Sequence, residues 1–350
     1  MFIEDGKRRY RVLLIASAIG LLVLMAASIT LGTANIDIGR VFRIVLSRFP
    51  FLGKYVDVQG IKGSHISIVM DIRLPRILLA ATAGMGLSVV GSVYQGIFRN
   101  PMADPFVLGI SSGSALGAAL AVVLGFEGTF LGISGTAILA FICAIITTYM
   151  VYNIARVGNK AAPVNLLLAG VAVSFFLSSI ISILMILNRN QLEKIVFWTM
   201  GSFSAASWKQ VGFLLAVTVP LVIIIYTFAR DINIMVTGED AAKSLGVDVE
   251  RIKRIMFLSS SVVVASIVSV SGIIGFVGLI IPHMARIITG SDYKKLIPFC
   301  GLFGAAFLVL SDTAARTLLS PVELPVGAIT SIFGAPYFIY LLYKSKKKVF

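Results

Sequence analysis

The sequence predicts an all-α integral membrane protein with about ten transmembrane helices. Of its 350 residues, 58% are hydrophobic and only 13% are charged, whereas a soluble domain of this length needs more charge to cover its surface. The apolar residues also gather in segments long enough to cross a bilayer as helices. The predicted spans of this single domain (1–350) are 12–32, 77–98, 105–125, 134–155, 164–187, 210–229, 255–271, 273–288, 297–311 and 325–343.

The first span, 12–32, follows a basic stretch, as the core of a signal peptide also does. Its apolar run of about 20 residues matches a bilayer span and exceeds the usual signal-peptide core. Ala26-Ala27-Ser28 lies inside that run, and no convincing cleavage site closes it. We therefore interpret the segment as a transmembrane helix.

Small residues recur at four-residue spacing in the next two spans, as Gly84 with Ser88 and as Gly109, Gly113 and Gly117. Such stripes let two helix backbones approach closely. The pattern predicts a compact bundle of many helices.

The region 255–288 is the least regular part of the pattern. Ser271-Gly272 fits either a tight turn between two spans or a kink within one. Gly275, Gly278 and Pro282 then indicate a short or broken helix, which a membrane protein tolerates where protein or a cavity satisfies the freed backbone groups.

Ten spans place both termini on the same side, so the basic residues can select that side. With the N-terminus inside, the inner segments hold nineteen of the 30 Lys and Arg, over fewer residues than the outer segments. The positive-inside rule then predicts that both termini are cytoplasmic. The outer segment 33–76 is unusually basic for its side, and within it we expect a loop with a short helix.

The spans are almost free of ionisable side chains. Asp, Glu, Lys and Arg are absent from 77–98, 105–126, 128–155, 161–188, 210–229, 255–282, 296–311 and 324–343. Ion-coupled carriers, voltage sensors and cation channels usually keep such groups at membrane depth, so these classes are disfavoured, although sodium coupling through backbone carbonyls stays open. Because 241–244 lacks the glycines of a phosphate-binding loop, the energy for transport must come from another protein.

The remaining composition excludes other classes of function. The formal net charge of +14 is scattered among apolar blocks, which argues against nucleic-acid binding. Cys143, Cys300, His65 and His283 do not stand at metal-ligand spacing. We therefore predict no catalytic residue, cofactor or metal site, and we interpret His65 as a solvated side chain rather than a haem ligand.

The largest inner loop, 230–254, carries a helical pattern of its own. Glu239 and Asp240 can open a short helix, where acids are favoured, and Gly246 can close it. Asp248 can cap a second helix that leads into the next span. The loop is either a firm knob that docks into another protein or a solvated loop, and the residues alone favour neither.

Several blocks of residues carry a resemblance to a known family. They are Ile72 to Arg76, Gln95 to Pro101 with Asp104-Pro105, Leu108 to Gly113, Leu166 to Gly170, Trp198 to Phe203, Gly238-Glu239 through Leu245-Gly246, Gly275 to Arg286, Glu323 to Gly327 and Gly334 to Pro336. From about residue 70 to 343 the chain resembles the FecCD family, the membrane subunits of ABC importers for ferric siderophores, haem and cobalamin. The resemblance implies a type II ABC importer permease architecture in the cytoplasmic membrane of a prokaryote.

The same resemblance implies partners and roles. The partners are a second copy of the chain or a paralogous permease, two ATP-binding cassette ATPase subunits and an extracytoplasmic solute-binding protein, all around membrane lipid and without nucleic acid. The resemblance assigns docking of the binding protein to Arg73, Arg76 and Arg316, whose guanidinium groups can bind carboxylates. For Arg73 and Arg76 the alternative is anchoring at the membrane interface. ATPase coupling falls to Glu239, Asp240, Ala241, Ala242, Lys243, Ser244, Leu245 and Gly246, and the inner gate to Asn159, Lys160, Ala161 and Ala162.

Four further residues have weaker assignments. Tyr94 and Gln95 are candidates for lining the pathway. His283 is expected to pack at a helix end. Glu323 is expected to cap the last helix, or to contact the binding protein.

The predicted function is therefore import of an iron chelate, a ferric siderophore, driven by ATP that a separate subunit hydrolyses. The same machinery importing cobalamin, haem or molybdate is the alternative within this class. An ion-coupled secondary transporter is the alternative from another class. The sequence does not select the chelate or decide between a homodimer and a heterodimer.

Overall fold

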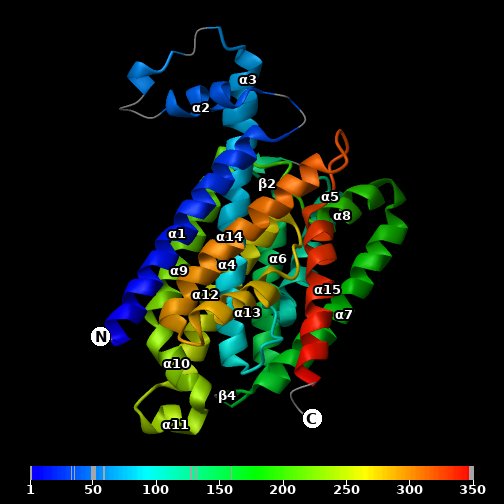
Figure 1. Ribbon diagram of the computed structural model, residues 1–350. Coiled ribbons are helices and arrows are strands. Elements are labelled where there is room, and N and C mark those ends of the chain that lie inside the picture. Colours follow the sequence, from blue (N-terminus) through cyan, green and yellow to red (C-terminus); the bar gives the residue numbers. More distant parts are fainter. Residues whose placement is uncertain are drawn as a thin grey trace.

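The computed structural model describes residues 2–32, 34, 36–48, 53–57, 60–126, 128–130, 132–158 and 160–346. Within them the chain forms a bundle of long helices with two very short hairpins (Figure 1). The α-helices are α1 (Phe2–Thr30), α2 (Ile38–Leu46), α3 (Gly63–Ser67), α4 (Leu74–Ile97), α5 (Ile110–Val123), α6 (Gly135–Ala155), α7 (Pro163–Leu187), α8 (Leu192–Thr199), α9 (Trp208–Thr227), α10 (Ala229–Thr237), α11 (Glu239–Ser244), α12 (Val249–Ser271), α13 (Val277–Thr289), α14 (Tyr293–Thr317) and α15 (Val326–Lys346).

Short elements connect these helices. The 3-10 turns are η1 (Gly53–Tyr55), η3 (Pro105–Leu108) and η4 (Arg189–Gln191), and η2 (Ile68–Arg73) is a π-helical segment. The strands are β1 (Thr129–Phe130), β2 (Ile133–Ser134), β3 (Arg156–Val157) and β4 (Lys160–Ala161), paired as antiparallel β1–β2 and β3–β4.

The predicted membrane fold is confirmed. Among the described residues, seven helices are long and apolar enough to cross a bilayer: Arg8–Thr30, Gly63–Ile97, Gly135–Ala155, Pro163–Leu187, Trp208–Thr227, Val249–Ser271 and Tyr293–Thr317. Three shorter apolar helices, Ile110–Val123, Val277–Thr289 and Val326–Leu341, coincide with the remaining predicted spans. The all-α class and a count near ten therefore hold.

Two boundaries differ from the prediction. The second span does not begin at residue 77, because α3, η2 and α4 continue one helical segment from Gly63 to Ile97. The charged residues that end the apolar run in the sequence, Arg73 and Arg76, are buried and hydrogen-bonded within the protein, so the helix continues through them. The second short helix expected at 249–254 is likewise the first part of α12.

The irregular region 255–288 is two helices rather than one kinked helix. Helix α12 ends at Gly272 with φ 67°, and α13 begins after Phe276 with φ 68°. Gly272 suits the left-handed region, and a side chain there would also collide with the carbonyl oxygen of Trp198. The turn therefore depends on glycine for both its conformation and its packing.

The core forms around α4, which packs against α14, α13, α9 and α12. A Cβ atom built on Gly84 would collide with the backbone of Gly304 in α14, and one on Gly91 would collide with the backbone of Gly278 in α13. Gly113 and Gly117 bring α5 equally close to α6. The predicted close packing along the small-residue stripes is confirmed.

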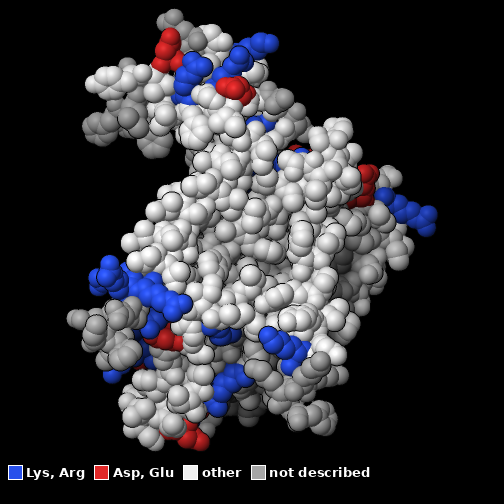
Figure 2. Space-filling view, viewed as in Figure 1, with Lys and Arg blue, Asp and Glu red and all other residues white. Residues whose placement is uncertain are grey.

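The bundle has two distinct ends. Helices α2 and α3 project beyond one end and α10 and α11 beyond the other, and α1 begins and α15 ends toward the latter (Figure 1). We name these the α2 end and the α11 end. Figure 2 shows that Lys, Arg, Asp and Glu gather near the two ends of the visible face and leave a broad uncharged band between them, as a surface surrounded by lipid requires.

Candidate functional sites at the two ends of the bundle

A cluster of three buried arginines lies at the α2 end. The side chains of Arg73, Arg76 and Arg316 are only 4%, 4% and 5% exposed. The Arg76 Nε donates to Asp312 Oδ1 at 2.9 Å, and its Nη1 donates to both carboxylate oxygens of Glu323 at 2.8 and 3.0 Å. These bonds tie α4 to α14 and to the loop before α15.

The other two arginines bind the end of α1. Arg73 Nη1 donates to the carbonyl oxygens of Ile29 and Thr30, at 2.8 and 3.1 Å, and its Nη2 donates to Ala34 O at 2.6 Å. Arg316 donates to the carbonyl oxygens of Leu31 and Ser28. The last carbonyl groups of a helix lack partners within it and favour a nearby cation, so the two arginines satisfy the end of α1.

This geometry differs from an exposed docking surface. Guanidinium groups that are buried and already donate to internal acceptors do not face a partner protein in this conformation. Their docking role stays a prediction, whereas their joining of α1, α4 and α14 is observed. The sequence did not reveal this because most of the groups that these arginines bind lie far from them in the chain. Asp312, a carboxylate just beyond a predicted span and four residues before Arg316, was the available signal.

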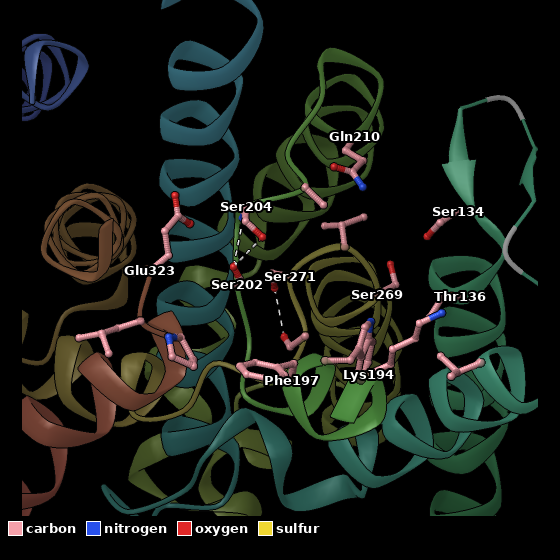
Figure 3. Close-up of a pocket in the computed structure, with 17 residues that line it drawn as sticks. Ser134, Thr136, Lys194, Phe197, Ser202, Ser204, Gln210, Ser269, Ser271 and Glu323 are labelled. Carbon is pink, nitrogen blue, oxygen red and sulfur yellow. Dashed lines mark hydrogen bonds between the residues drawn. The ribbon is translucent and has the colours of Figure 1, made fainter. Parts of the chain in front are cut away.

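A cavity of about 530 Å³ opens at the same end. Figure 3 shows Glu323 on one side of it, Ser134, Thr136 and Lys194 on the other, and serines of the 200–207 loop and of α12 between them. Its lining is Val122, Ser134, Thr136, Lys194, Phe197, Trp198, Ser202, Ser204, Ala205, Gln210, Ser269, Val270, Ser271, Gly272, Glu323, Leu324 and Pro325. The many hydroxyl groups suit a hydrated, polar occupant.

The 200–207 loop that forms one wall of this cavity is held by backbone hydrogen bonds. Ser202 N donates to Ser271 O at 2.7 Å, and Val326 N donates to Gly201 O at 2.9 Å. Gly201, with φ 73°, allows this crossing between the end of α12 and the start of α15. Sequence reasoning missed this cavity, although the block Trp198–Phe203 was among those that carried the resemblance.

The predicted short helix at the opposite end is confirmed as α11. Gly238 (φ 151°) precedes it, Gly246 (φ 81°) follows it, and the Asp248 carboxylate accepts a hydrogen bond from Arg251 N at 3.1 Å. The α10–α11 knob, residues 229–246, projects from the bundle, and within it α11 lies between the two glycines. It buries Ala242 and exposes Leu245, which is 70% accessible.

An ion pair fastens this knob to the bundle. Lys253 Nζ, on the buried face of α12, donates to Glu239 Oε1 at 2.7 Å, and Arg99 Nη2 lies 4.0 Å from the same oxygen. Partial burial alone would raise the pKa of the Glu239 carboxyl. The hydrogen bond and charge of Lys253, together with the charges of Arg99 and Lys243, outweigh it and lower that pKa.

The segment predicted as a gate forms the β3–β4 hairpin. Gly158, with φ 62°, follows β3, and Asn159 lies outside the described residues. The backbones of Lys160 and Ala161 form β4, and Ala162, which is exposed, precedes α7 and its first residue, Pro163. A constriction needs a second surface, so the gate assignment stays a prediction.

The two pathway candidates lie inside the bundle. Tyr94 is fully buried, with its ring 5.7 Å from Phe98 and 5.8 Å from Phe257. Gln95 is 3% exposed and donates to Leu279 O at 3.1 Å. Neither side chain reaches a surface or lines one of the cavities described here, and their pathway role stays a prediction.

Gln95 instead belongs to a polar network that sequence reasoning missed. Arg286 of α13 donates to Gln95 Oε1 of α4 and, at 3.2 Å, to the Tyr293 hydroxyl of α14. Tyr293 N in turn donates to Asn233 Oδ1 at 2.9 Å, which brings in α10. The network therefore joins the α10–α11 knob to three helices of the bundle.

The described residues include no group of three or more His, Cys, Asp or Glu side chains that could hold a metal ion. His283 Nδ1 lies 3.1 Å from the Tyr337 hydroxyl, as expected for packing between α13 and α15. Glu323, expected to cap the last helix, instead binds Arg76.

Comparisons with known proteins agree with this architecture. A sequence model of the FecCD transport family matches residues 20–344. The cobalamin import system permease of Halobacterium salinarum is 42% identical over 81% of this chain and 75% of its own length. The hemin transport system permease of Yersinia pestis is 38% identical over 80% and 82%. A solved inward-facing structure, described as a metal-chelate type ABC transporter, has a TM-score of 0.76 and 32% identity over 93% of this chain and 98% of its own.

Proposed function

The chain belongs to the FecCD transport family of ABC importer permeases, a multi-pass protein of prokaryotic membranes, and on that premise we propose that it imports an iron chelate. In this proposal two copies of the chain assemble with two ATPase subunits and an extracytoplasmic binding protein. ATP hydrolysed by the separate subunits drives a ferric siderophore into the cytoplasm.

The α10–α11 knob is the observation that carries the proposal. It projects beyond the bundle, its glycine turns set its shape, and the Lys253–Glu239 pair fixes its position. The apolar stretches 77–98, 105–126, 128–155, 161–188, 210–229, 255–282, 296–311 and 324–343 contain no Asp, Glu, Lys or Arg. The ionisable groups of these helices lie near the two ends, so they form no chain across the membrane that could couple transport to an ion gradient. Because the knob is fixed in this way, a movement of an external ATPase that contacts it can be transmitted to the bundle. We therefore assign coupling to residues 239–246.

The α11 end is cytoplasmic in this proposal. The inner segments of the positive-inside assignment include the knob and both chain termini. The polar cavity and the arginine cluster then face the extracytoplasmic side, where the binding protein delivers its cargo.

The second copy is proposed to pack on the flank formed by α7 and α15. This flank lies opposite α1 (Figure 1) and exposes large apolar side chains, among them Phe175 (73%), Phe176 (63%) and Phe333 (59%). A pathway along this flank would pass the β3–β4 hairpin, which precedes α7. A paralogous permease in place of the second copy is the alternative.

The metal-chelate description of the solved structure and the hemin relative support an iron-containing cargo. The cobalamin relative keeps cobalamin as the main alternative, alongside haem and molybdate. Similarity to several importers of one class does not identify which of these cargoes the chain transports, because the binding protein can determine the specificity.

The test is uptake into proteoliposomes that contain the chain, its ATPase and its binding protein. We expect ATP-dependent accumulation of a radioactive ferric siderophore that stops when either partner is omitted. If the binding protein retained cobalamin or haem in place of the siderophore, the proposed cargo would be wrong, but the assignment to ABC importer permeases would stand. Uptake by the chain alone, driven by an ion gradient, would overturn the proposal in favour of a secondary transporter.

A further inference from the structure

The arginine cluster at the α2 end carries one positive charge more than its carboxylates balance. Among the described residues, Arg73, Arg76 and Arg316 form ion pairs only with Asp312 and Glu323. Arg73 donates only to carbonyl oxygens, which do not neutralise its charge. Asp71, the acid nearest to it in the sequence, is exposed and forms no ion pair in this part of the chain.

The same cluster contains donors without acceptors. Arg76 Nη2 and Arg316 Nε are buried and have no hydrogen-bond partner. Arg316 Nε lies 3.7 Å from Asp312 Oδ2, beyond hydrogen-bond range, and that carboxylate oxygen is likewise buried without a partner. A buried charge that lacks its partner costs several kcal/mol, so the structure favours any ligand that compensates it.

A small cavity adjoins these groups. It has a volume of about 130 Å³, and Gly32, Ala34, Ile68 and Ile72 complete a lining that otherwise consists of the three arginines and Glu323. Gly32 has φ 154°, and a Cβ atom at this position would lie 2.7 Å from Arg73 Nη2, so a larger residue would displace the guanidinium group. The cavity therefore presents three cationic groups and one carboxylate, that of Glu323, beside apolar side chains, so its ionisable lining carries a net positive charge.

We propose that this cavity binds one small monovalent anion of the halide or carboxylate class. The anion neutralises the excess charge of Arg73 and lies against the guanidinium groups of α4 and α14. Guanidinium groups are weakly hydrated and present several donors in one plane, which suits halide ions and small carboxylates. Occupancy stabilises the junction of α1, α4 and α14 at the α2 end, and this inference does not depend on which cargo the chain transports.

The test is thermal unfolding of the purified full chain in detergent, at constant ionic strength and potassium concentration, in chloride, bromide, formate or gluconate. Gluconate serves as the size control because its six-carbon body does not fit beside the arginines. We expect the Tm to be higher by roughly 2–4 °C in the three small anions than in gluconate, with a saturable concentration dependence.

Two variants locate the effect. Arg73→Gln removes the uncompensated charge and should abolish the difference between chloride and gluconate. Glu323→Gln adds a net charge of one and should lower the half-saturating chloride concentration by roughly fivefold or more. Arg189→Gln, an exposed arginine of η4, is the matched control and should respond as the unaltered chain does.

Two outcomes would overturn the proposal. One is the same Tm in all four salts for the unaltered chain. The other is a chloride effect that Arg73→Gln and Glu323→Gln leave unchanged, because the anion would then bind elsewhere. If Arg73→Gln does not fold, the change in half-saturating chloride concentration in Glu323→Gln tests the proposal by itself: a decrease supports it, and no change or an increase contradicts it.

Discussion

Lys253 is a charged residue on the buried face of a helix, only 4% exposed, and its neighbours explain how the fold tolerates it. Its ammonium group binds Glu239 at 2.7 Å and lies 3.7 Å from Glu250, so the charge is compensated where α12 meets α11. The Lys253–Glu239 pair fixes the position of the knob more specifically than apolar packing alone, because removing either residue takes away the main partner of the other.

This pair predicts a pH dependence of the knob. The pKa of the Glu239 carboxyl is lowered from its ordinary value of 4.5, so the pair stabilises the attached knob above that pH and the contribution is lost as pH falls through the lowered pKa. A spin label at Leu245→Cys, in a chain with Cys143 and Cys300 replaced by serine, should become more mobile below about pH 4.5. Glu239→Gln should be mobile at every pH; equal mobility of both chains across the range would contradict the role of the pair.

The arginines illustrate what single residues reveal in a sequence and what they conceal. Arg73 and Arg76 stand at the edge of an apolar run, where a guanidinium group at a membrane interface is usual. Their burial depends on carbonyl groups of α1 and on Asp312, the latter 236 positions from Arg76. No local pattern contains that information, so the sequence did not reveal that these arginines are buried or which groups they bind.

At the scale of helices, close packing sets the positions of α13 and α14 against α4. The small-residue stripes were visible in the sequence and predicted this proximity, but not which helices meet, because Gly84 and Gly304 are far apart in the chain. The break at 272–276 was also anticipated, since glycines concentrate there. The continuation of α4 backward to Gly63 was not anticipated, because charged residues interrupt the apolar run.

Gly91 provides a test of this packing. A methyl group at Gly91→Ala would collide with the backbone of Gly278, which has no flexible side chain to move aside. We expect a loss of about 1–3 kcal/mol of stability, measured as a lower Tm in detergent. Gly212→Ala in α9 is the control, because its Cβ meets nothing within 4 Å and should be neutral or slightly stabilising; an equal loss in both would indicate a general helix effect.

The Arg286 network makes a prediction about coupling, which rests on the proposed function. Arg286→Met removes the donors to Gln95 and Tyr293 that join α13 to α4 and α14. Removing a hydrogen bond to a charged group can lower a rate by roughly a factor of ten or more. The rate of transport should therefore fall by that factor while ATP hydrolysis by the complex continues.

The matched control for this prediction is Arg251→Met, an exposed arginine at the same end. It should leave both rates near those of the unaltered chain. Parallel loss of ATP hydrolysis and transport in Arg286→Met would indicate failed assembly, and unchanged transport would show that the network does not transmit the motion.

At the scale of the whole molecule, two opposite flanks expose apolar side chains, and only one is proposed to meet another copy. In a chain whose Cys143 and Cys300 are replaced by serine, a cysteine at Phe333 of α15 should form cross-linked dimers in the membrane. A cysteine at Ile19 of α1, exposed to a similar degree (56% against 59%), should not. Dimers through Ile19 alone would place the interface on the opposite flank.

Sequence reasoning recovered the membrane class, a span count near ten and the short helix α11, because each depends on composition or on short-range signals. It did not recover the polar cavity, the Arg286 network or the charge balance at the α2 end. Each of these brings together residues from four or more separate segments, and only the folded bundle places them in contact.

Helix α4 has a mechanical consequence that follows from where its polar side chains lie. Arg76, near its start, joins the arginine cluster, and Gln95, near its end, joins the Arg286 network. The 24-residue helix is about 36 Å long, with about 28 Å between these two residues, and it contains no proline beyond its first turn. A helix of this kind moves as one rigid body. A tilt imposed on it at one membrane surface therefore also moves its end at the other surface, so the positions of the two ends are coupled.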